Sequence, residues 1–171
     1  RGRVSSLPLR TRLAQGAHAL GLELSAEQLD RLLAYLDLLA RWNKVYNLTA
    51  VRDPQEMLTH HLLDSLAAIG PLLRQTGGKP GFAAGPPIRL LDVGSGGGLP
   101  GVVIAITCPQ IEVHCVDTVL KKATFIQQVA ATLRLPNLRG MHAAIAAARD
   151  AAPPIWKVRI VSWVPGSPID W

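Results

Sequence analysis

The chain has 171 residues, of which 49% are hydrophobic and 18% are charged, and its formal net charge is +6. A disordered chain would be poor in apolar residues and rich in charge, so this composition indicates a folded protein. The numbers of glycines (15), prolines (13) and cysteines (2) exclude a collagen-like chain and a disulfide-stapled one. The length fits one hydrophobic core, or one core with a small extension.

The positive charge is concentrated toward the C-terminus. Residues 118–171 hold seven basic and two acidic side chains. Such an excess favours anionic partners such as nucleic acid, although a solvated basic surface explains it equally well. No run of about 18 apolar residues is present, so we expect no membrane span. Cys108 and Cys115 lack partners at metal-ligand spacing, which predicts two small buried residues in a reducing, cytoplasmic compartment.

Residues 1–73 are predicted to form a helical cap. Ser25 and Gln28 have the spacing of a capping box, and an apolar stripe of helical period follows them. The pair at 53–54, an aspartate before a proline, predicts a second helix start. Residues 74–87 are rich in glycine and proline without any period, which indicates a linker loop.

From residue 88 onward, short apolar runs alternate with helical patterns. Residues 88–93 and 111–116 are predicted strands, and 138–142 and 156–164 are weaker candidates. Strands that alternate with helices indicate a parallel, doubly wound sheet. We therefore expect an α/β fold in which residues 88–171 form a partial Rossmann-like domain of about four strands behind the N-terminal helical cap.

The sharpest local signal is the run DVGSGGGLPG at residues 92–101, which follows a predicted strand and precedes a helix. Gly94 and Gly96 allow a tight turn and let a ligand approach bare backbone, at the strand end where open α/β sheets bind ligands. Asp117 ends the next strand, where a carboxylate can accept both hydroxyls of a ribose. The simpler alternative is a glycine turn without a ligand, with Asp117 as a helix N-cap.

Two classes of cofactor compete for this loop. The nicotinamide fingerprint G-x-G-x-x-G needs a third glycine at position 99, where the chain has Leu99. The spacing D-x-G-x-G-x-G, from Asp92 to Gly98, resembles instead motif I of the S-adenosylmethionine-dependent methyltransferases. We therefore expect S-adenosylmethionine at the loop, with NAD as a distant alternative.

The run WNKVYNLT, at residues 42–49, combines two aromatics, two amides and a lysine. Aromatic rings can stack on bases and lysine can contact phosphate, whereas the plainer interpretation has both rings closing the core. Farther along, His60 and Asp64 share a helix face, but no third ligand is evident, so we expect no metal. A polar cluster that faces the second domain is the expectation for this segment.

The runs WNKVYNLT, RDPQEML, HHLLDSL, LLDVGSGGGLPG and VDTVLKKATFIQQV, in this order, resemble the ribosomal RNA small subunit methyltransferase G family, also called glucose-inhibited division protein B. The resemblance covers roughly residues 10–145. It implies a bacterial cytoplasmic enzyme that transfers a methyl group from S-adenosylmethionine to N7 of a guanine in 16S rRNA of the small ribosomal subunit. We expect a monomer.

The resemblance also assigns cofactor contacts. Gly94 and Leu99 match the contacting positions of the glycine loop, beside Gly96, and Asp117 matches the acid that ends the second strand. Residues 145–146, Ile145 and Ala146, fall where the family has a hydrophobic-acidic pair against the adenine. The alanine departs from that pattern.

Lys121 and Lys122 match a basic pair of the family, and together with Lys44 they are predicted to hold rRNA phosphates. Guanine N7 has an in-plane lone pair and carries no proton, so the reaction needs no general base and we nominate no catalytic residue. Beyond about residue 147 the resemblance degrades, and residues 88–171 are too few for a seven-stranded methyltransferase sheet. The alternative function is therefore a catalytically impaired RNA- or nucleotide-binding fragment.

Overall fold

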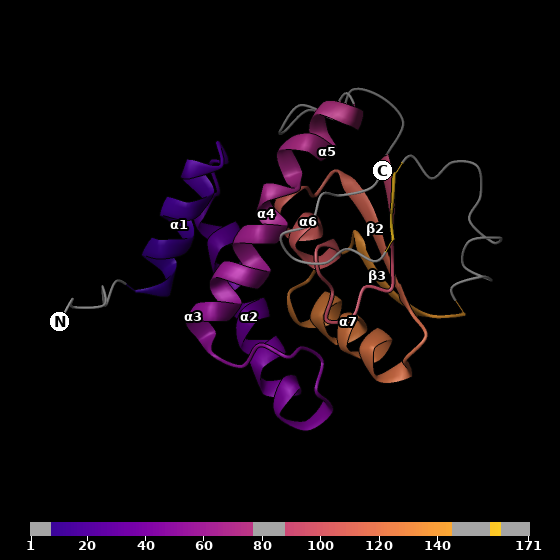
Figure 1. Cartoon of the computed structure of the whole chain (residues 1–171). Coiled ribbons are helices and arrows are strands. Elements are labelled where there is room, and N and C mark those ends of the chain that lie inside the picture. Colours follow the sequence, from indigo (N-terminus) through magenta and orange to yellow (C-terminus); the bar gives the residue numbers. More distant parts are fainter. Residues whose placement is uncertain (1–7, 77–87, 145–157, 162–171) are drawn as a thin grey trace.

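The structure is a computed structural model that describes residues 8–76 and 88–144, together with the backbone of residues 158–161. Helices come first along the chain and strands that alternate with helices follow (Figure 1). The N-terminal helices are α1 (Leu9–Ala19), α2 (Ala26–Tyr46), α3 (Pro54–Met57), the π-helix η1 (Leu58–Leu63), α4 (Asp64–Ala67) and α5 (Ile69–Thr76). The second part consists of β1 (Ile88–Val93), α6 (Gly101–Thr107), β2 (Ile111–Asp117), α7 (Leu120–Thr132), β3 (Leu138–His142) and β4 (Val158–Val161).

Both predicted helix starts are present. Ser25 Oγ accepts a hydrogen bond from the Gln28 amide at 3.1 Å, and the Ser25 amide donates to Gln28 Oε1 at 3.0 Å. The Asp53 carboxylate accepts from the two amides that follow Pro54. These contacts satisfy backbone donors that the first turn of a helix leaves free. The helix that begins at Pro54 changes to π geometry at η1, which the apolar period did not predict.

Four parallel strands form the sheet, in the order β3-β2-β1-β4. Ile88 pairs with Ile111, and Asp117 at the end of β2 pairs with His142 at the end of β3. The expected parallel α/β sheet of about four strands is therefore confirmed. The two weaker strand candidates are also strands, although β4 is described only over Val158–Val161.

The described helices lie on one side of the sheet in Figure 1. Helices α6 and α7 pack on the strands, and α2 packs in turn on both of them. One continuous hydrophobic cluster joins the cap to the sheet, and its fully buried members include Leu32, Tyr35, Leu39, Leu58, Ile104, Val113 and Phe125. Burying such a side chain contributes roughly 1.5–3 kcal/mol, so the cap and the sheet stabilise each other.

The predicted boundary between the cap and the linker is close to the observed end of α5. That helix continues to Thr76, three residues past the predicted cap, and residues 77–87 lie outside the described part of the chain. Among the residues that the structure describes, no helix is both long and apolar enough to cross a bilayer.

Candidate functional site

The glycine loop leaves the carboxyl end of β1 and leads into α6. The amides of Gly94 and Ser95 donate to the carbonyl of Val116 in the neighbouring strand, at 2.8 and 3.2 Å. Gly94, Gly96 and Gly98 have φ angles of +74°, +55° and +92°. A residue with a Cβ is strained at such angles, so this backbone path depends on the glycines.

Two buried carboxylates, Asp92 and Asp117, accept hydrogen bonds from backbone amides of the loop. Asp92 Oδ2 accepts a hydrogen bond from the Gly101 amide at 3.0 Å, which fixes the end of the loop at the start of α6. Asp117 Oδ2 accepts from the Gly96 amide at 2.9 Å, and its Oδ1 accepts from the Val119 amide at 2.9 Å. The two strands therefore fix the loop at two separate amides.

Burial raises the pKa of Asp92 to about 7. The Gly101 amide opposes this rise by stabilising the charged form, and the nearby charge of Asp117 adds to it. Asp92 thus titrates near neutral pH, although its carboxylate lies beneath the loop and not on its open side.

The glycines of the loop divide into two kinds. A Cβ on Gly98 would lie 2.4 Å from Val102 Cγ2, and one on Gly101 would lie 2.6 Å from Cys115 Sγ, so these two glycines permit close packing. By contrast, no heavy atom of the described residues lies within 4 Å of a Cβ built on Gly94 or Gly96. The loop therefore presents bare backbone to open space at these two positions, as a ligand-binding loop requires.

The structure brings four of the predicted cofactor residues together. Gly94, Gly96 and Leu99 share the loop, and Asp117 binds it directly. Leu99 is half-buried and packs against the core, so only part of its side chain is accessible. Ile145 and Ala146 lie outside the described residues.

Asp117 combines features of both sequence interpretations. Its bond to the Val119 amide lies next to the start of α7, close to the N-cap role that the ligand-free alternative assigned to it. Its bond to Gly96 also places it under the open part of the loop. An ionised carboxylate offers about four lone-pair sites and uses two here, so it can still accept the hydroxyl groups of a ligand.

Tyr35 is a site residue that the sequence analysis missed. Its ring is fully buried on α2, and its hydroxyl donates to the carbonyl of Gly97 at 2.6 Å. Burial, together with Cys115 and Asp92, raises its pKa well above the usual value, so the hydroxyl stays protonated and remains a donor. The available signal was a hydroxyl-bearing aromatic three residues after Leu32, on the apolar face of the predicted helix.

The aromatic residues of the N-terminal motif lead from the core to the surface. The Trp42 ring lies 5.4 Å from Phe125 of α7 and 5.2 Å from Tyr46, measured between centroids. Lys121 Nζ lies 5.2 Å from the centroid of the Tyr46 ring. Trp42 therefore closes the core, as the plainer interpretation expected, whereas Tyr46 lies beside the predicted RNA-binding residues of α7.

The remaining polar residues of this region form a cluster inside the cap. Asn43 is 2% exposed, and its Oδ1 accepts from the Thr49 amide at 2.8 Å. Thr49 Oγ1 is 2.9 Å from His61 Nε2, and burial lowers the pKa of that histidine. The cluster ties the end of α2 to η1. Within the described ranges, no group of three His, Cys, Asp or Glu side chains could hold a metal ion.

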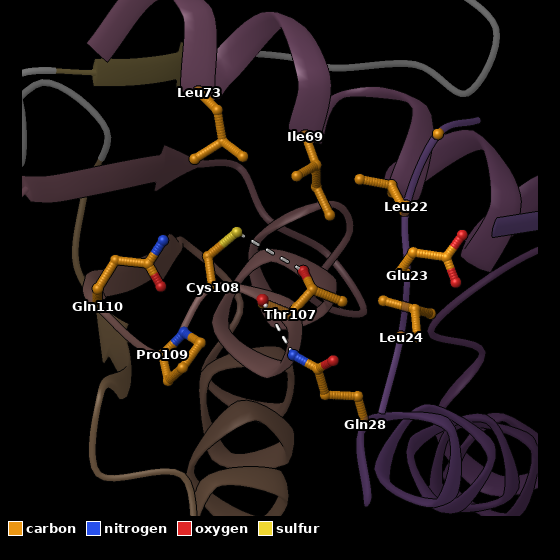
Figure 2. A pocket seen from close by; sticks show the side chains of 11 residues that line it. Leu22, Glu23, Leu24, Gln28, Ile69, Leu73, Thr107, Cys108, Pro109 and Gln110 are labelled. Carbon is orange, nitrogen blue, oxygen red and sulfur yellow. Dashed lines mark hydrogen bonds between the residues drawn. The ribbon is translucent and has the colours of Figure 1, made fainter. Parts of the chain in front are cut away.

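A separate cavity of about 420 Å³ lies beside the amino end of β2, at the end of the strands opposite the glycine loop (Figure 2). It is lined by residues 21–24, Gln28, Ile69 and Leu73 of α5, and residues 107–110, which come directly before β2. Helix α6 runs from the glycine loop to this cavity, so the two are about 10 Å or more apart. The cavity contains none of the predicted site residues.

Both cysteines are buried, as predicted, and Cys108 lines this cavity. Burial raises the pKa of the Cys108 thiol to about 11, against the opposing effect of its contact with Thr107. The thiol is therefore protonated at neutral pH, which fits a packing residue and not a nucleophile.

The parallel sheet, with a glycine loop open at its carboxyl edge, places the chain in the class of Rossmann-like α/β proteins. A family model described as "GidB: rRNA small subunit methyltransferase G" matches residues 28–155. Two relatives, both named "Ribosomal RNA small subunit methyltransferase G", come from Acidovorax sp. (strain JS42) and Paracidovorax citrulli (strain AAC00-1). They are 64% and 65% identical over 143 and 144 residues, which cover 83% and 82% of this chain.

The chain belongs to the rRNA small subunit methyltransferase G family. It spans 63% and 58% of the length of these two curated relatives. Among solved structures, a coclaurine N-methyltransferase bound to N-methylheliamine and SAH is 14% identical, with a TM-score of 0.38. The alignment covers 84% of this chain and 41% of that one, and a TM-score this low bears on neither fold nor function.

We expect Asp92 to make the folded protein less stable as the pH rises from about 4 to about 7. Its pKa is raised from the usual 3.8 to about 7 on folding, so over this range the folded state binds the proton more tightly than the unfolded state. In Asp92→Asn the amide oxygen can still accept from Gly101 but cannot titrate. Urea unfolding of both proteins between pH 4 and 8 should show the wild-type free energy of unfolding falling relative to the variant.

Burial lowers the pKa of His61, so the unfolded state binds that proton more tightly than the folded state. His61 therefore makes the folded protein more stable as the pH rises, which is opposite to the effect of Asp92. Both proteins keep His61, so their difference isolates Asp92. Parallel curves for the two proteins would show that Asp92 is not titrating in this range.

Proposed function

We propose that the chain binds S-adenosylmethionine at the glycine loop and methylates N7 of a guanine in 16S rRNA of the small ribosomal subunit. The observation that carries the proposal is the open backbone at Gly94 and Gly96 above the carboxylate of Asp117. It occurs in a chain whose relatives are named for methylation of small-subunit rRNA.

The residues at the loop fit such a cofactor. Gly94 and Gly96 let it lie against main chain, where a larger side chain would occupy the space. Asp117 has lone pairs left to accept the two hydroxyls of a ribose. Leu99 offers an apolar surface at the end of the loop. The cofactor, when bound, supplies a methyl group on a positively charged sulfur.

The proposed methyl transfer requires the protein to orient the cofactor and the guanine, and it requires no proton transfer. Guanine N7 brings its own lone pair and loses no proton, so no general base is required. The two carboxylates near the loop are engaged with backbone amides, which fits a role in holding the loop. A rigid loop is useful here because in-line attack depends on the alignment of the reacting atoms and on exclusion of water.

The charge around the carboxyl edge supports an RNA substrate. Residues 38–52 and 118–144 contain several lysines and arginines and no aspartate or glutamate. These segments meet where Lys121 of α7 contacts Tyr46 at the end of α2. Lys44, Lys121 and Lys122 are the phosphate contacts that we propose at this edge.

Replacement of Gly94 by alanine should abolish most of the cofactor affinity. Gly94→Ala adds a methyl group on the open side of the loop, and Gly21→Ala provides a matched control. Gly21 has nearly the same φ (+75°, against +74°) and equally open surroundings among the described residues. Both variants should lose about 1–2 kcal/mol of stability to backbone strain.

Only Gly94→Ala should weaken S-adenosylmethionine binding, by roughly tenfold or more, which isothermal titration would measure. Equal affinity in both variants would exclude this loop as the cofactor site.

Methyl transfer tests the reaction itself. The chain, incubated with 16S rRNA or small subunits and S-adenosylmethionine labelled in its methyl group, should yield 7-methylguanosine after nuclease digestion. Label on another atom would refute the N7 assignment. Saturable binding of cofactor and RNA without transfer would favour the second candidate function, binding without catalysis.

The three lysines should account for much of the salt dependence of RNA binding. Each phosphate contact to a single strand contributes about 0.7 to the slope of log K against log salt. Replacing Lys44, Lys121 and Lys122 together by glutamine should therefore lower the slope by about 2. Arg74, exposed on α5 at the opposite edge, is the control for loss of charge. A slope unchanged in the triple variant would exclude these lysines as phosphate contacts.

A further inference from the structure

Exposed apolar side chains gather at the carboxyl edge of the sheet. Of the large hydrophobic residues exposed in the described part of the chain, five lie at the ends of α2 and β3 or the start of α7, and Leu20 lies elsewhere. The five are Val45, Tyr46, Val119, Leu120 and Met141. The segments meet in space, because Lys121 contacts Tyr46 and the His142 ring bonds to the carbonyl of Thr118 at 3.0 Å.

Tyr46 is the outermost of three aromatic rings. Phe125 is fully buried, Trp42 packs on it, and Tyr46 packs on Trp42 while remaining 41% exposed. An aromatic ring that is already packed on a neighbouring ring loses little conformational freedom when a ligand stacks on it. Tyr46 is therefore suited to bind a flat group from solution.

The charge beside Tyr46 limits what that group can be. Lys121 Nζ lies 5.2 Å from the ring centroid, and residues 38–52 and 118–144 contain no carboxylate. A surface that combines an aromatic face with a lysine ammonium group matches the base and phosphate of an unpaired nucleotide. The bases of a duplex are already stacked and would leave the ring without a partner.

We propose that Tyr46 is a stacking site for an unpaired base of the RNA substrate and that Lys121 binds the adjacent phosphate. This rests on the proposed function, because it names the form of RNA that the site takes. The contact between Lys121 and Tyr46 is of the weak, exposed cation–π kind, whereas stacking of a base on an aromatic ring is stronger. A base can thus take the ring face while the ammonium turns to the phosphate.

Tyr46 lies at the same end of the strands as the glycine loop. Lys121 lies four residues after Asp117, whose carboxylate binds the glycine loop and the Val119 amide. A nucleotide held at Tyr46 therefore lies at the same edge of the sheet as the proposed cofactor. Tyr46 is a positioning residue in this scheme, since no reacting atom touches it.

The test compares a labelled single-stranded oligoribonucleotide with a duplex of the same length, by fluorescence anisotropy at several salt concentrations. The wild-type chain should prefer the single strand. Tyr46→Leu, which keeps apolar bulk against Trp42, should weaken single-strand binding roughly tenfold and leave the salt slope unchanged. Lys121→Gln should lower the slope, because it removes a phosphate contact.

The conservative change Tyr46→Phe should bind as the wild type does, because stacking needs the ring and not the hydroxyl. Leu20→Ala is the control for loss of an exposed apolar group, since Leu20 is 42% exposed and lies away from the carboxyl edge. It should leave RNA affinity unchanged. Circular dichroism checks that each variant is folded.

Equal binding of single strand and duplex, no loss in Tyr46→Leu, or an equal loss in Tyr46→Phe would each overturn the proposal. S-adenosylmethionine affinity, measured on the same samples, separates it from the proposed function. Tyr46-dependent binding of single strands by a chain that binds no cofactor would refute the methyltransferase and retain the stacking site.

Discussion

The hydrogen bond from the Tyr35 hydroxyl to the Gly97 carbonyl joins the helical cap to the glycine loop of the sheet domain. Both groups are buried, so loss of the donor would leave the carbonyl without a partner and would destabilise the protein by roughly 1–3 kcal/mol. The cap therefore helps to hold the glycine loop in place. The continuous hydrophobic core that runs from the cap helices to the sheet supports the same connection.

The loop is held on its buried side and left open on the other. Asp92 accepts a hydrogen bond from the amide at the end of the loop, and Asp117 accepts one from an amide in its middle. The Tyr35 hydroxyl donates to a carbonyl between these two amides. Since the Asp92, Asp117 and Tyr35 side chains are buried, these contacts are stronger than ordinary surface hydrogen bonds. The result is a fixed backbone with free space at Gly94 and Gly96, which is the arrangement that a preorganised binding loop needs.

Features encoded by neighbouring residues could be predicted from the sequence. The capping box at Ser25, the strands of the sheet and the glycine loop all depend on patterns a few residues long. The bond from Tyr35 to Gly97 joins residues 62 positions apart, and no local pattern specifies such a contact. The raised pKa of Asp92 was missed for the same reason, because it depends on burial and on Asp117 of the neighbouring strand. The apolar period of the sequence also did not distinguish the π geometry of η1 from an α-helix.

Helix α2 links the glycine loop to the surface at the carboxyl ends of the strands. Tyr35 and Tyr46 are 11 residues apart, which is about three turns, so they share a face of the helix. Tyr35 holds the loop from the middle of that face, and Tyr46 reaches solvent at its end. A rigid helix of this kind fixes the distance between the loop and any group bound at Tyr46. The spacing between the glycine loop and the Tyr46 ring is therefore set by α2, which the common hydrophobic core holds against the sheet.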